Sequence, residues 1–323
     1  MAIVSPLKAP PPRRLSLADA TDGTTVAPDW LILYGDDKIG KSTWSSEAPK
    51  PLFIRFEDRH HHIAAKKLPV IRDEVDEAGK VVEHGLPTFL GILSDLTHSA
   101  HDYQTIIIDT VTTLEPIVAS WVCSQNGKSS LDDFGYGRGP NAALEEWRRI
   151  INALEMLRSK RGVGIHLLGH VQIRKFNSPD AAVGEFDRFQ LQLHEKVAGL
   201  LRQRVDNIFF AQNEILSAVK DGRTKGISTG VRLMRTRRTA AWDAGNSLAL
   251  PETMPFSYAD YAKAKAKFST VDPAELSTEV ETLIPTLPPE HQVTAREYLA
   301  KAGTDRTKLA QLIDWIRARA AGV

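Results

Sequence analysis

Short apolar runs alternate along the chain with longer segments of mixed polarity, beginning at Trp30. Short apolar runs bounded by turn-forming residues predict buried β-strands, and most of these are separated by stretches long enough to hold crossover helices. The pattern therefore predicts an α/β fold with a mostly parallel central sheet covered by helices on both faces. The runs occupy residues 31–34, 52–56, 105–108, 164–168 and 207–211.

The clearest helix is expected at residues 141–158. Apolar residues recur there at intervals of three or four, and charged residues fall between them, which is the pattern of a helix with one buried face. The apolar positions are Leu144, Trp147, Ile151 and Leu154.

The pattern changes after residue 211. Apolar runs at residues 215–219 and 231–234 flank a Gly- and Lys-rich turn at residues 221–226. Two such runs around a turn predict a hairpin, so we expect the sheet to continue there as an antiparallel extension.

Composition divides the chain into three parts. Residues 1–29 are rich in proline with little apolar periodicity, so we expect a flexible N-terminal arm. Residues 30–266 should form the α/β core. Residues 267–323 carry helix signals, with Asp272 and Pro273 at one helix start, and predict a small C-terminal helical module.

Charge and cysteine content exclude several classes of protein. The 323 residues hold 41 Lys plus Arg against 40 Asp plus Glu, so the chain is not a uniformly basic nucleic-acid coat. The single cysteine, Cys123, cannot form an internal disulfide, which is typical of a reducing compartment. No apolar run approaches the roughly 18 residues of a membrane span. We therefore expect a cytoplasmic protein with no membrane partner.

The strongest motif follows the first predicted strand. Residues 35–42 fit G-x-x-x-x-G-K-[ST] and precede a helix-compatible segment, which predicts a phosphate-binding loop (P-loop) for ATP. Glycines let the backbone N–H groups turn inward to phosphate oxygens, and the helix N-terminus adds positive charge. The expected nucleotide-binding residues are Gly35, Asp36, Asp37, Lys38, Ile39, Gly40, Lys41, Ser42 and Thr43.

Individual roles follow from the chemistry of these side chains. Lys41 should reach the β- and γ-phosphates, and the Ser42 hydroxyl should hold Mg²⁺. Asp36 and Asp37 oppose phosphate, so we expect their side chains to point outward.

Acids at the ends of neighbouring strands complete the expected catalytic set. Asp109 ends the run at residues 105–108 and is our candidate for a second Mg²⁺ ligand, or for a cap of the following helix. Glu57 ends the run at residues 52–56 and should orient or deprotonate the attacking water, with Asp58 as the alternative. His170 and Gln172 follow the strand at residues 164–168 and could sense the γ-phosphate, although a packed or capping histidine explains His170 equally well.

Taken in this order, the motifs resemble those of phage-encoded RecA-like P-loop ATPases. The likeness covers about residues 30–262 and is nearest to the core-only RecA homologues that accompany single-strand annealing and recombination genes, in the phage nucleotide-binding protein family. It rests on YGDDKIGKSTW at residues 34–44, IIIDTVTTLEP at 106–116, DDFGYGRG at 132–139 and LLGHVQIRKF at 167–176.

The resemblance implies ATP hydrolysis, a homo-oligomer with ATP at subunit interfaces, and single-stranded DNA bound by two loops. Those loops would lie at about residues 124–141 and 176–190. If the protein is phage-encoded, the host cytoplasm is its compartment. The candidate DNA-binding residues in and beside the loops are Lys128, Phe134, Tyr136, Arg138, Arg174 and Lys175.

One stretch departs from the family pattern. Relatives carry a basic segment near the end of the core, where this chain has Ala244-Gly245-Asn246-Ser247. The nearby Arg235, Arg237 and Arg238 are candidates for acting in trans on a neighbour's ATP. They belong to residues 220–238, which hold seven basic residues and one acid and could contact DNA or another subunit.

The leading hypothesis is thus an ATPase of phage recombination or replication, stimulated by single-stranded DNA. One alternative is a single-strand annealing protein that uses ATP only as a slow switch. Another is a P-loop kinase of a small molecule, which is weakened because no Arg-rich lid segment is evident. The helical tail could dock a single-strand-binding or annealing protein, or simply cap the core.

Overall fold

The computed structural model describes residues 27–59, 62–177, 184–220, 223–270 and 272–320. Most of the arm expected at residues 1–29 therefore lies outside the described residues. The strands are β1 (Trp30–Gly35), β2 (Pro51–Arg55), β3 (Lys66–Val70), β4 (Glu74–Val75), β5 (Val81–Glu83), β6 (Thr105–Asp109), β7 (Gly164–Asn177), β8 (Glu185–Leu191), β9 (Asn207–Lys220), β10 (Arg223–Arg235) and β11 (Thr253–Pro255).

Helices alternate with these strands through the core and then continue alone. They are α1 (Lys41–Ser46), α2 (Gly85–His98), α3 (Val111–Gln125), α4 (Arg138–Arg161), α5 (Glu195–Arg204), α6 (Tyr258–Thr270), α7 (Pro273–Leu283), α8 (Pro289–Ala302) and α9 (Arg306–Ala320), with 3₁₀ turns η2 (Leu131–Phe134) and η3 (Ile284–Thr286). The helix expected at residues 141–158 is α4, which extends beyond both predicted ends and stops at Gly162, where φ is 64°.

The central sheet has the order β11-β10-β9-β1-β7-β6-β2-β3, and β8 pairs with β7 outside this row. Pairing is parallel from β9 to β3 and antiparallel in β9–β10, β10–β11 and β7–β8. The mixed α/β fold with a mostly parallel sheet and an antiparallel extension is therefore confirmed.

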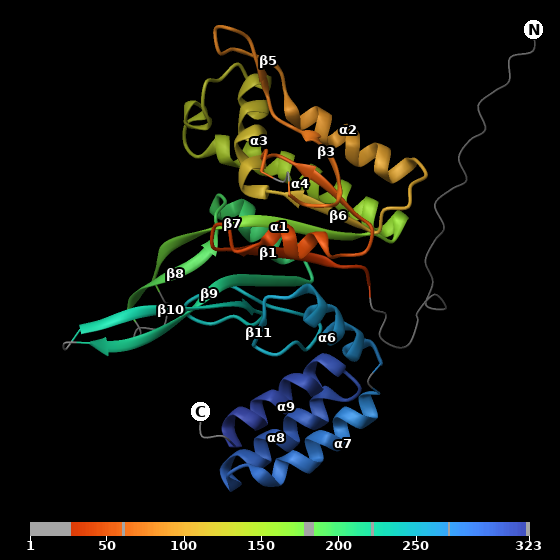
Figure 1. Cartoon of the computed structure of the whole chain (residues 1–323), viewed down its shortest axis with the longest axis vertical. Helices are drawn as coiled ribbons and strands as arrows, with labels where there is room; N and C mark the ends of the chain where they lie inside the picture. Colours follow the sequence, from red (N-terminus) through yellow and green to blue (C-terminus); the bar gives the residue numbers. More distant parts are fainter. Residues whose placement is uncertain (1–26, 60–61, 178–183, 221–222, 271, 321–323) are drawn as a thin grey trace, which may run out of the picture.

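Alternating residues of the strands pack on opposite faces of the sheet. Ile32 and Ile54 join the cluster that α2, α3, α4 and α5 cover, with Trp147 near its centre. Leu33 and Phe53 face the other way, toward α1 and α6. Figure 1 shows these layers, and burial on both faces explains why the strands read as nearly continuous apolar runs.

Two hairpins project past the edge of the sheet that carries the P-loop (Figure 1). Gly35, the last residue of β1, lies opposite His170 of β7 and Ala211 of β9, and both neighbouring strands continue well beyond this level. The runs at residues 207–211 and 215–219 thus form one strand, because the intervening Gln212–Glu214 contains no Gly or Pro to break it.

The two segments expected as DNA-binding loops contain regular structure. Residues 124–141 include η2 and the first turn of α4, and residues 176–190 belong largely to the β7–β8 hairpin, whose tip lies outside the described residues. The small β4–β5 sheet and α2 were not predicted from the sequence.

The C-terminal helices α7 to α9 form a module with its own hydrophobic cluster, as expected (Figure 1). The Asp272 carboxylate caps α7 by accepting from the Ala274 N–H. The preceding helix, α6, packs instead on the core through Tyr261 and Phe268, so the change of cluster falls between α6 and α7. An Arg237–Asp314 ion pair joins core and module.

A buried polar network holds α6 against the start of β1. The Asp29 carboxylate accepts hydrogen bonds from the Tyr261 hydroxyl at 2.7 Å and the Lys265 ammonium at 2.5 Å. His166 Nε2 lies 3.5 Å from the same carboxylate, and its other nitrogen faces Ser45 Oγ. Burial alone would raise the pKa of Asp29, but His166 and Lys265 lower it below the usual range.

Candidate nucleotide-binding site

The P-loop joins β1 to α1 in a conformation that two glycines make possible. A Cβ at Gly35 would lie 2.0 Å from the Ala211 carbonyl oxygen, so β9 leaves no room for a side chain there. Gly40 has φ of 103°, a region that side chains disfavour. The Gly40 carbonyl accepts the Trp44 N–H at 2.8 Å and begins α1, whose first N–H groups then remain for a phosphate.

Lys41 turns back over this loop. Its ammonium donates to the Gly35 and Asp36 carbonyl oxygens, at 2.9 Å each, and its side chain is 8% exposed. Burial lowers the pKa of Lys41, although nearby carboxylates oppose that shift. Lys38 and Thr43 are exposed, and the Ile39 side chain is buried under β10 and β11, which leaves only the Ile39 backbone for a ligand.

The acids of the loop bind side chains of neighbouring strands. Asp36 Oδ2 accepts from the backbone and side-chain nitrogens of Asn213 on β9, at 3.2 and 3.3 Å. Asp37 Oδ1 lies 2.8 Å from His170 Nδ1 on β7. The negative charges that oppose phosphate are thereby engaged on both sides of the loop.

Ser42 and Asp109, the two candidate Mg²⁺ ligands, lie in contact. The Ser42 hydroxyl donates to Asp109 Oδ2 at 2.5 Å, and Asp109 is buried at the end of β6. A hydroxyl and a carboxylate beside a phosphate loop are the hard oxygen ligands that Mg²⁺ prefers, so this donor set fits the ion. The helix-capping role considered for Asp109 belongs to Thr110, whose hydroxyl accepts the Thr113 N–H at 3.2 Å.

Glu57 lies in the same cluster, just beyond the end of β2. Its Oε1 accepts from the Thr110 hydroxyl at 3.1 Å and faces His170 Nε2 at 3.0 Å, and Arg59 is 3.7 Å from Oε2. The hydrogen bond to His170 lowers the pKa of Glu57. Asp58, the alternative, is largely exposed and pairs with Arg55.

His170 bridges two carboxylates, Asp37 and Glu57. Each ring nitrogen faces an acceptor oxygen, and only the protonated ring can donate from both nitrogens. The hydrogen bond to Glu57 accordingly raises the pKa of His170. Gln172 does not join this cluster, because its amide donates to the Leu191 and Leu193 carbonyl oxygens.

The sequence analysis missed Asn213, Thr110 and Arg232. Arg232, on β10, donates from Nη1 to the Ile39 carbonyl oxygen at 3.0 Å and so touches the P-loop directly. The only sequence signal for Arg232 was its place in a basic run, and nothing in that run distinguished it from its neighbours.

The three arginines predicted to act on a neighbour's ATP contact residues of their own chain. Arg235 stacks on Trp242 and donates to Thr253 Oγ1 at 2.5 Å, and Arg237 pairs with Asp314. Arg238 is the most exposed of the set, at 65%, and lies 3.4 Å from Asp243.

The candidate DNA-binding residues differ in their exposure and in their contacts. Lys128, Tyr136 and Arg138 are exposed, Tyr136 completely, whereas Phe134 packs partly against the core. On β7, Arg174 donates to the Leu193 carbonyl oxygen and Lys175 pairs with Glu185.

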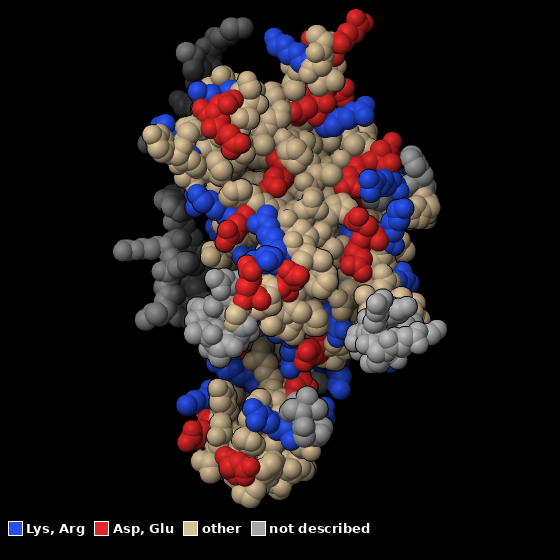
Figure 2. Space-filling view, turned by 90° about the vertical axis from the view of Figure 1, so that its left-hand side faces the viewer, with Lys and Arg blue, Asp and Glu red and all other residues tan. Residues whose placement is uncertain are grey.

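Basic and acidic side chains are interspersed over the described part of this face (Figure 2). The side chains of Lys220, Arg223 and Lys225, which the basic run at residues 220–238 includes, lie outside the description.

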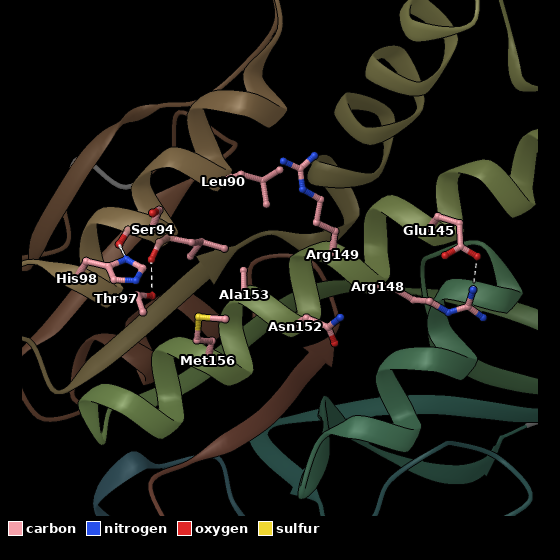
Figure 3. A pocket seen from close by; sticks show the side chains of 11 residues that line it. Leu90, Ser94, Thr97, His98, Glu145, Arg148, Arg149, Asn152, Ala153 and Met156 are labelled. Atoms are coloured by element: carbon pink, nitrogen blue, oxygen red, sulfur yellow. Dashed lines mark hydrogen bonds and ion pairs between the residues drawn. The ribbon is translucent and has the colours of Figure 1, made fainter. Parts of the chain in front are cut away.

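A separate hollow of about 540 Å³ lies between α2 and α4 (Figure 3). Leu90 and Ala153 line it together with Arg148, which pairs with Glu145, and with Met156. None of the P-loop cluster contributes to its wall, so it is distinct from the nucleotide site.

Comparisons with known proteins place the core in a family. The sequence model of the family described as AAA domain matches residues 28–248. The SPbeta prophage-derived uncharacterized protein YorG of Bacillus subtilis (strain 168) is 27% identical over 126 residues, which are 37% of this chain and 35% of that protein. The chain thus spans about a third of the length of this curated relative.

Solved structures with some likeness include the RadB recombinase, with a TM-score of 0.35 and 13% identity over 65% of this chain and 80% of that one. The flagellar accessory protein FlaH from Methanocaldococcus jannaschii has a TM-score of 0.31 and 10% identity over 70% of this chain and 84% of that one. No helix in the described part of the present chain combines the length and the apolar character that a membrane crossing requires.

Proposed function

Because the chain belongs to the AAA domain family, whose P-loop it carries in full, we propose that it is an Mg²⁺-dependent ATPase of phage DNA recombination or replication. In this proposal the protein acts as an oligomer on single-stranded DNA. The phage setting is supported by the prophage-derived relative, over the part of the chain that the two share.

One observation carries the catalytic part of the proposal. Glu57 stands beside the Ser42–Asp109 pair and is linked through His170 to Asp37 of the P-loop. A carboxylate, a hydroxyl–carboxylate pair and a lysine around one phosphate loop are the parts that phosphoryl transfer to water requires.

The roles of the residues follow from their contacts. Lys41 would exchange its backbone partners for phosphate oxygens, and Ser42 and Asp109 would hold Mg²⁺, which would neutralise charge on the phosphates. Glu57 orients the attacking water. Its carboxylate accepts a hydrogen bond from this water and makes the water a better nucleophile, which the neutral amide of a Gln would do far less well.

His170 is placed to report the state of the site. A γ-phosphate is a third anion that competes with Asp37 and Glu57 for its two N–H groups. Such a change would shift β7, and with it the β7–β8 hairpin that carries Arg174 and Lys175. This is how we propose that ATP affects DNA binding.

The DNA-binding part of the proposal rests on exposure and charge. Tyr136 can stack on a base, and Lys128 and Arg138 can contact phosphates from the same segment. Arg238 is the best placed of the arginines to reach a neighbour's ATP, because most of its surface is free. In this proposal the C-terminal helical module binds a single-strand-binding or annealing protein.

The test is ATP turnover with and without single-stranded DNA. We expect DNA to stimulate turnover, and Glu57→Gln to lower it by about a hundredfold or more while ATP binding persists. Lys41→Ala should lose binding, and Asp58→Asn, a change in the neighbouring acid, should retain turnover. Absence of turnover in the wild type, or equal turnover in Glu57→Gln, contradicts the catalytic assignment.

The same proteins distinguish the two alternative functions, an annealing factor and a small-molecule kinase. A protein that anneals strands equally well with Lys41→Ala would be an annealing factor with a slow nucleotide switch. Phosphate transfer to a nucleoside or metabolite, without affinity for DNA, would identify a small-molecule kinase.

A further inference from the structure

Strand β10 is irregular at the level of the P-loop. Its register against β9 shifts between Ser228 and Arg232, and Gly230 within this stretch has φ of 77°. Four steps along β10 here match two steps along β9, so the shift moves the positions that follow it along β9 without changing the face of the sheet that they occupy. Arg232 is the first paired residue after the shift, and its guanidinium reaches from the sheet to the Ile39 carbonyl oxygen at 3.0 Å.

The bond to Ile39 controls the orientation of one peptide group. In a trans peptide the carbonyl and the following N–H point in opposite directions. With the Ile39 carbonyl held outward by Arg232, the Gly40 N–H is directed to the opposite side, into the loop. That N–H belongs to the set that a P-loop presents to phosphate.

The surroundings leave this peptide little freedom to rotate. A Cβ at Gly40 would lie 2.9 Å from Arg232 Nη1, so the guanidinium lies directly against the glycine. On the other side, the Ile39 side chain is buried with Trp44 and Met234.

Two residues that pair across the β9–β10 hairpin bind the P-loop at different points. Arg232 lies opposite Asn213 in the strand pairing, and Asn213 binds Asp36 while Arg232 binds Ile39. The sheet order puts β9 and β10 on one side of β1, and the strands that carry His170, Asp109 and Glu57 on the other. Arg232 therefore acts on the phosphate loop and not on the attacking water.

We infer that Arg232 is a positioning residue for nucleoside di- and triphosphates, which presents the Gly40 N–H to the phosphate chain from within the same subunit. The inference rests on the proposed nucleotide binding. It separates Arg232 from Arg235, Arg237 and Arg238, the arginines that follow it in the same basic run.

The experiment compares Arg232→Ala with Arg148→Ala, a matched change of an exposed arginine on α4 whose partner is Glu145. Dissociation constants for ATP and ADP are measured by calorimetry on the full chain, and KM and kcat by ATP turnover. Arg232→Ala should lower the affinity for both nucleotides about tenfold and raise KM with little change in kcat. The reason is that a bond that orients the loop contributes equally to binding in the ground state and in the transition state.

Chemical rescue separates positioning from a general loss of structure. Millimolar guanidinium chloride should restore much of the ATP affinity of Arg232→Ala, whereas equal sodium chloride should not, and Arg148→Ala should respond to neither. Nucleotide-free thermal unfolding reports whether each variant is folded, and Arg232→Gln replaces Arg232→Ala if the latter is not.

The outcomes distinguish this inference from the proposed function. If the wild type binds neither nucleotide, both are overturned. The positioning role of Arg232 alone is overturned if the wild type binds ATP and Lys41→Ala does not, but a folded Arg232 variant binds ATP like the wild type. It is also overturned if that variant loses ATP affinity and guanidinium does not restore it.

Discussion

His170 shows how far a single side chain can connect this site. Its ring lies between Asp37 on the P-loop and Glu57 beyond β2, two segments that α1 and β2 separate along the chain. Two acceptors around one imidazole favour the protonated ring, so the bridge carries a positive charge between two negative ones. The charge state of His170 therefore determines how firmly Glu57 is held.

This bridge makes stability depend on pH in a defined direction. The pKa of His170 is raised from 6.5, so its contribution is complete below pH 6.5 and is lost as pH rises through the folded-state pKa. The pKa of Glu57 is lowered from 4.5, so its contribution is complete above pH 4.5 and is lost as pH falls through its folded-state pKa. The window of full stabilisation lies between these values.

We therefore expect the free energy of unfolding lost in His170→Gln to be largest between pH 4.5 and 6.5 and to shrink on both sides. Urea unfolding of both proteins across pH measures this difference. The same substitution made in Glu57→Gln should show a weaker pH dependence, because one partner is already neutral. A difference that grows steadily above pH 7 would contradict the assignment.

At the scale of elements, α6 depends on a few polar contacts as well as on packing. Tyr261 is fully buried and donates to Asp29, which stands immediately before β1. The network also includes His166 on β7 and Ser45 on α1, three residues after Ser42. The position of α6 is thus tied to the strand and the helix on either side of the P-loop.

Tyr261→Phe should lower the free energy of unfolding by about 2 kcal/mol, because a hydrogen bond to a buried carboxylate is lost while the ring stays in place. Tyr298→Phe, which changes an exposed tyrosine of α8, should alter it by less than about 0.5 kcal/mol. Denaturant unfolding gives both values. Equal effects in the two variants would show that the polar network does not stabilise α6.

Some of these elements could be predicted from the sequence, for reasons that their residues make clear. Buried strands such as β1 and β6 are short and apolar throughout, and the P-loop motif gives the position of α1. Strand β3 was missed because it contains Lys66, Lys67 and Pro69, which hide an edge strand.

Candidate site residues could be predicted where a polar residue directly follows an apolar strand. They could not be predicted where the contact depends on how distant strands pair. Asp109 and Glu57 come directly after apolar runs, and both lie where the pattern put them. Arg232 lies opposite Asn213, within reach of the P-loop, after a register shift in β10, and a shift of two residues leaves no mark in hydrophobic periodicity. Gln172 lies two residues after His170 on β7, yet its amide binds the end of β8.

At the scale of the whole molecule, the helical module and the core have separate hydrophobic clusters. Val280, Ile313 and Ile316 pack with one another and not with the sheet. The side chains of the Arg237–Asp314 ion pair are 29% and 32% exposed, and pairs near the surface add little stability. The core should therefore stand without the module.

A chain ending at Thr270 should remain folded and bind ATP with an affinity within about twofold of the full chain, because α6 and both faces of the sheet stay covered. Calorimetry and thermal unfolding measure this. As a milder comparison, Asp314→Asn in the full chain should change the free energy of unfolding by less than about 1 kcal/mol. Loss of folding in the shortened chain would show that the module supports the core.

The contacts of Lys41 have a kinetic consequence. Its ammonium has three N–H groups, and the Gly35 and Asp36 carbonyl oxygens already accept from it. Capture of a nucleotide is therefore an exchange of partners and not a simple addition, with a release step that occurs within the protein. Such a step adds its own free-energy cost to capture, so the association rate constant should lie below the diffusion limit.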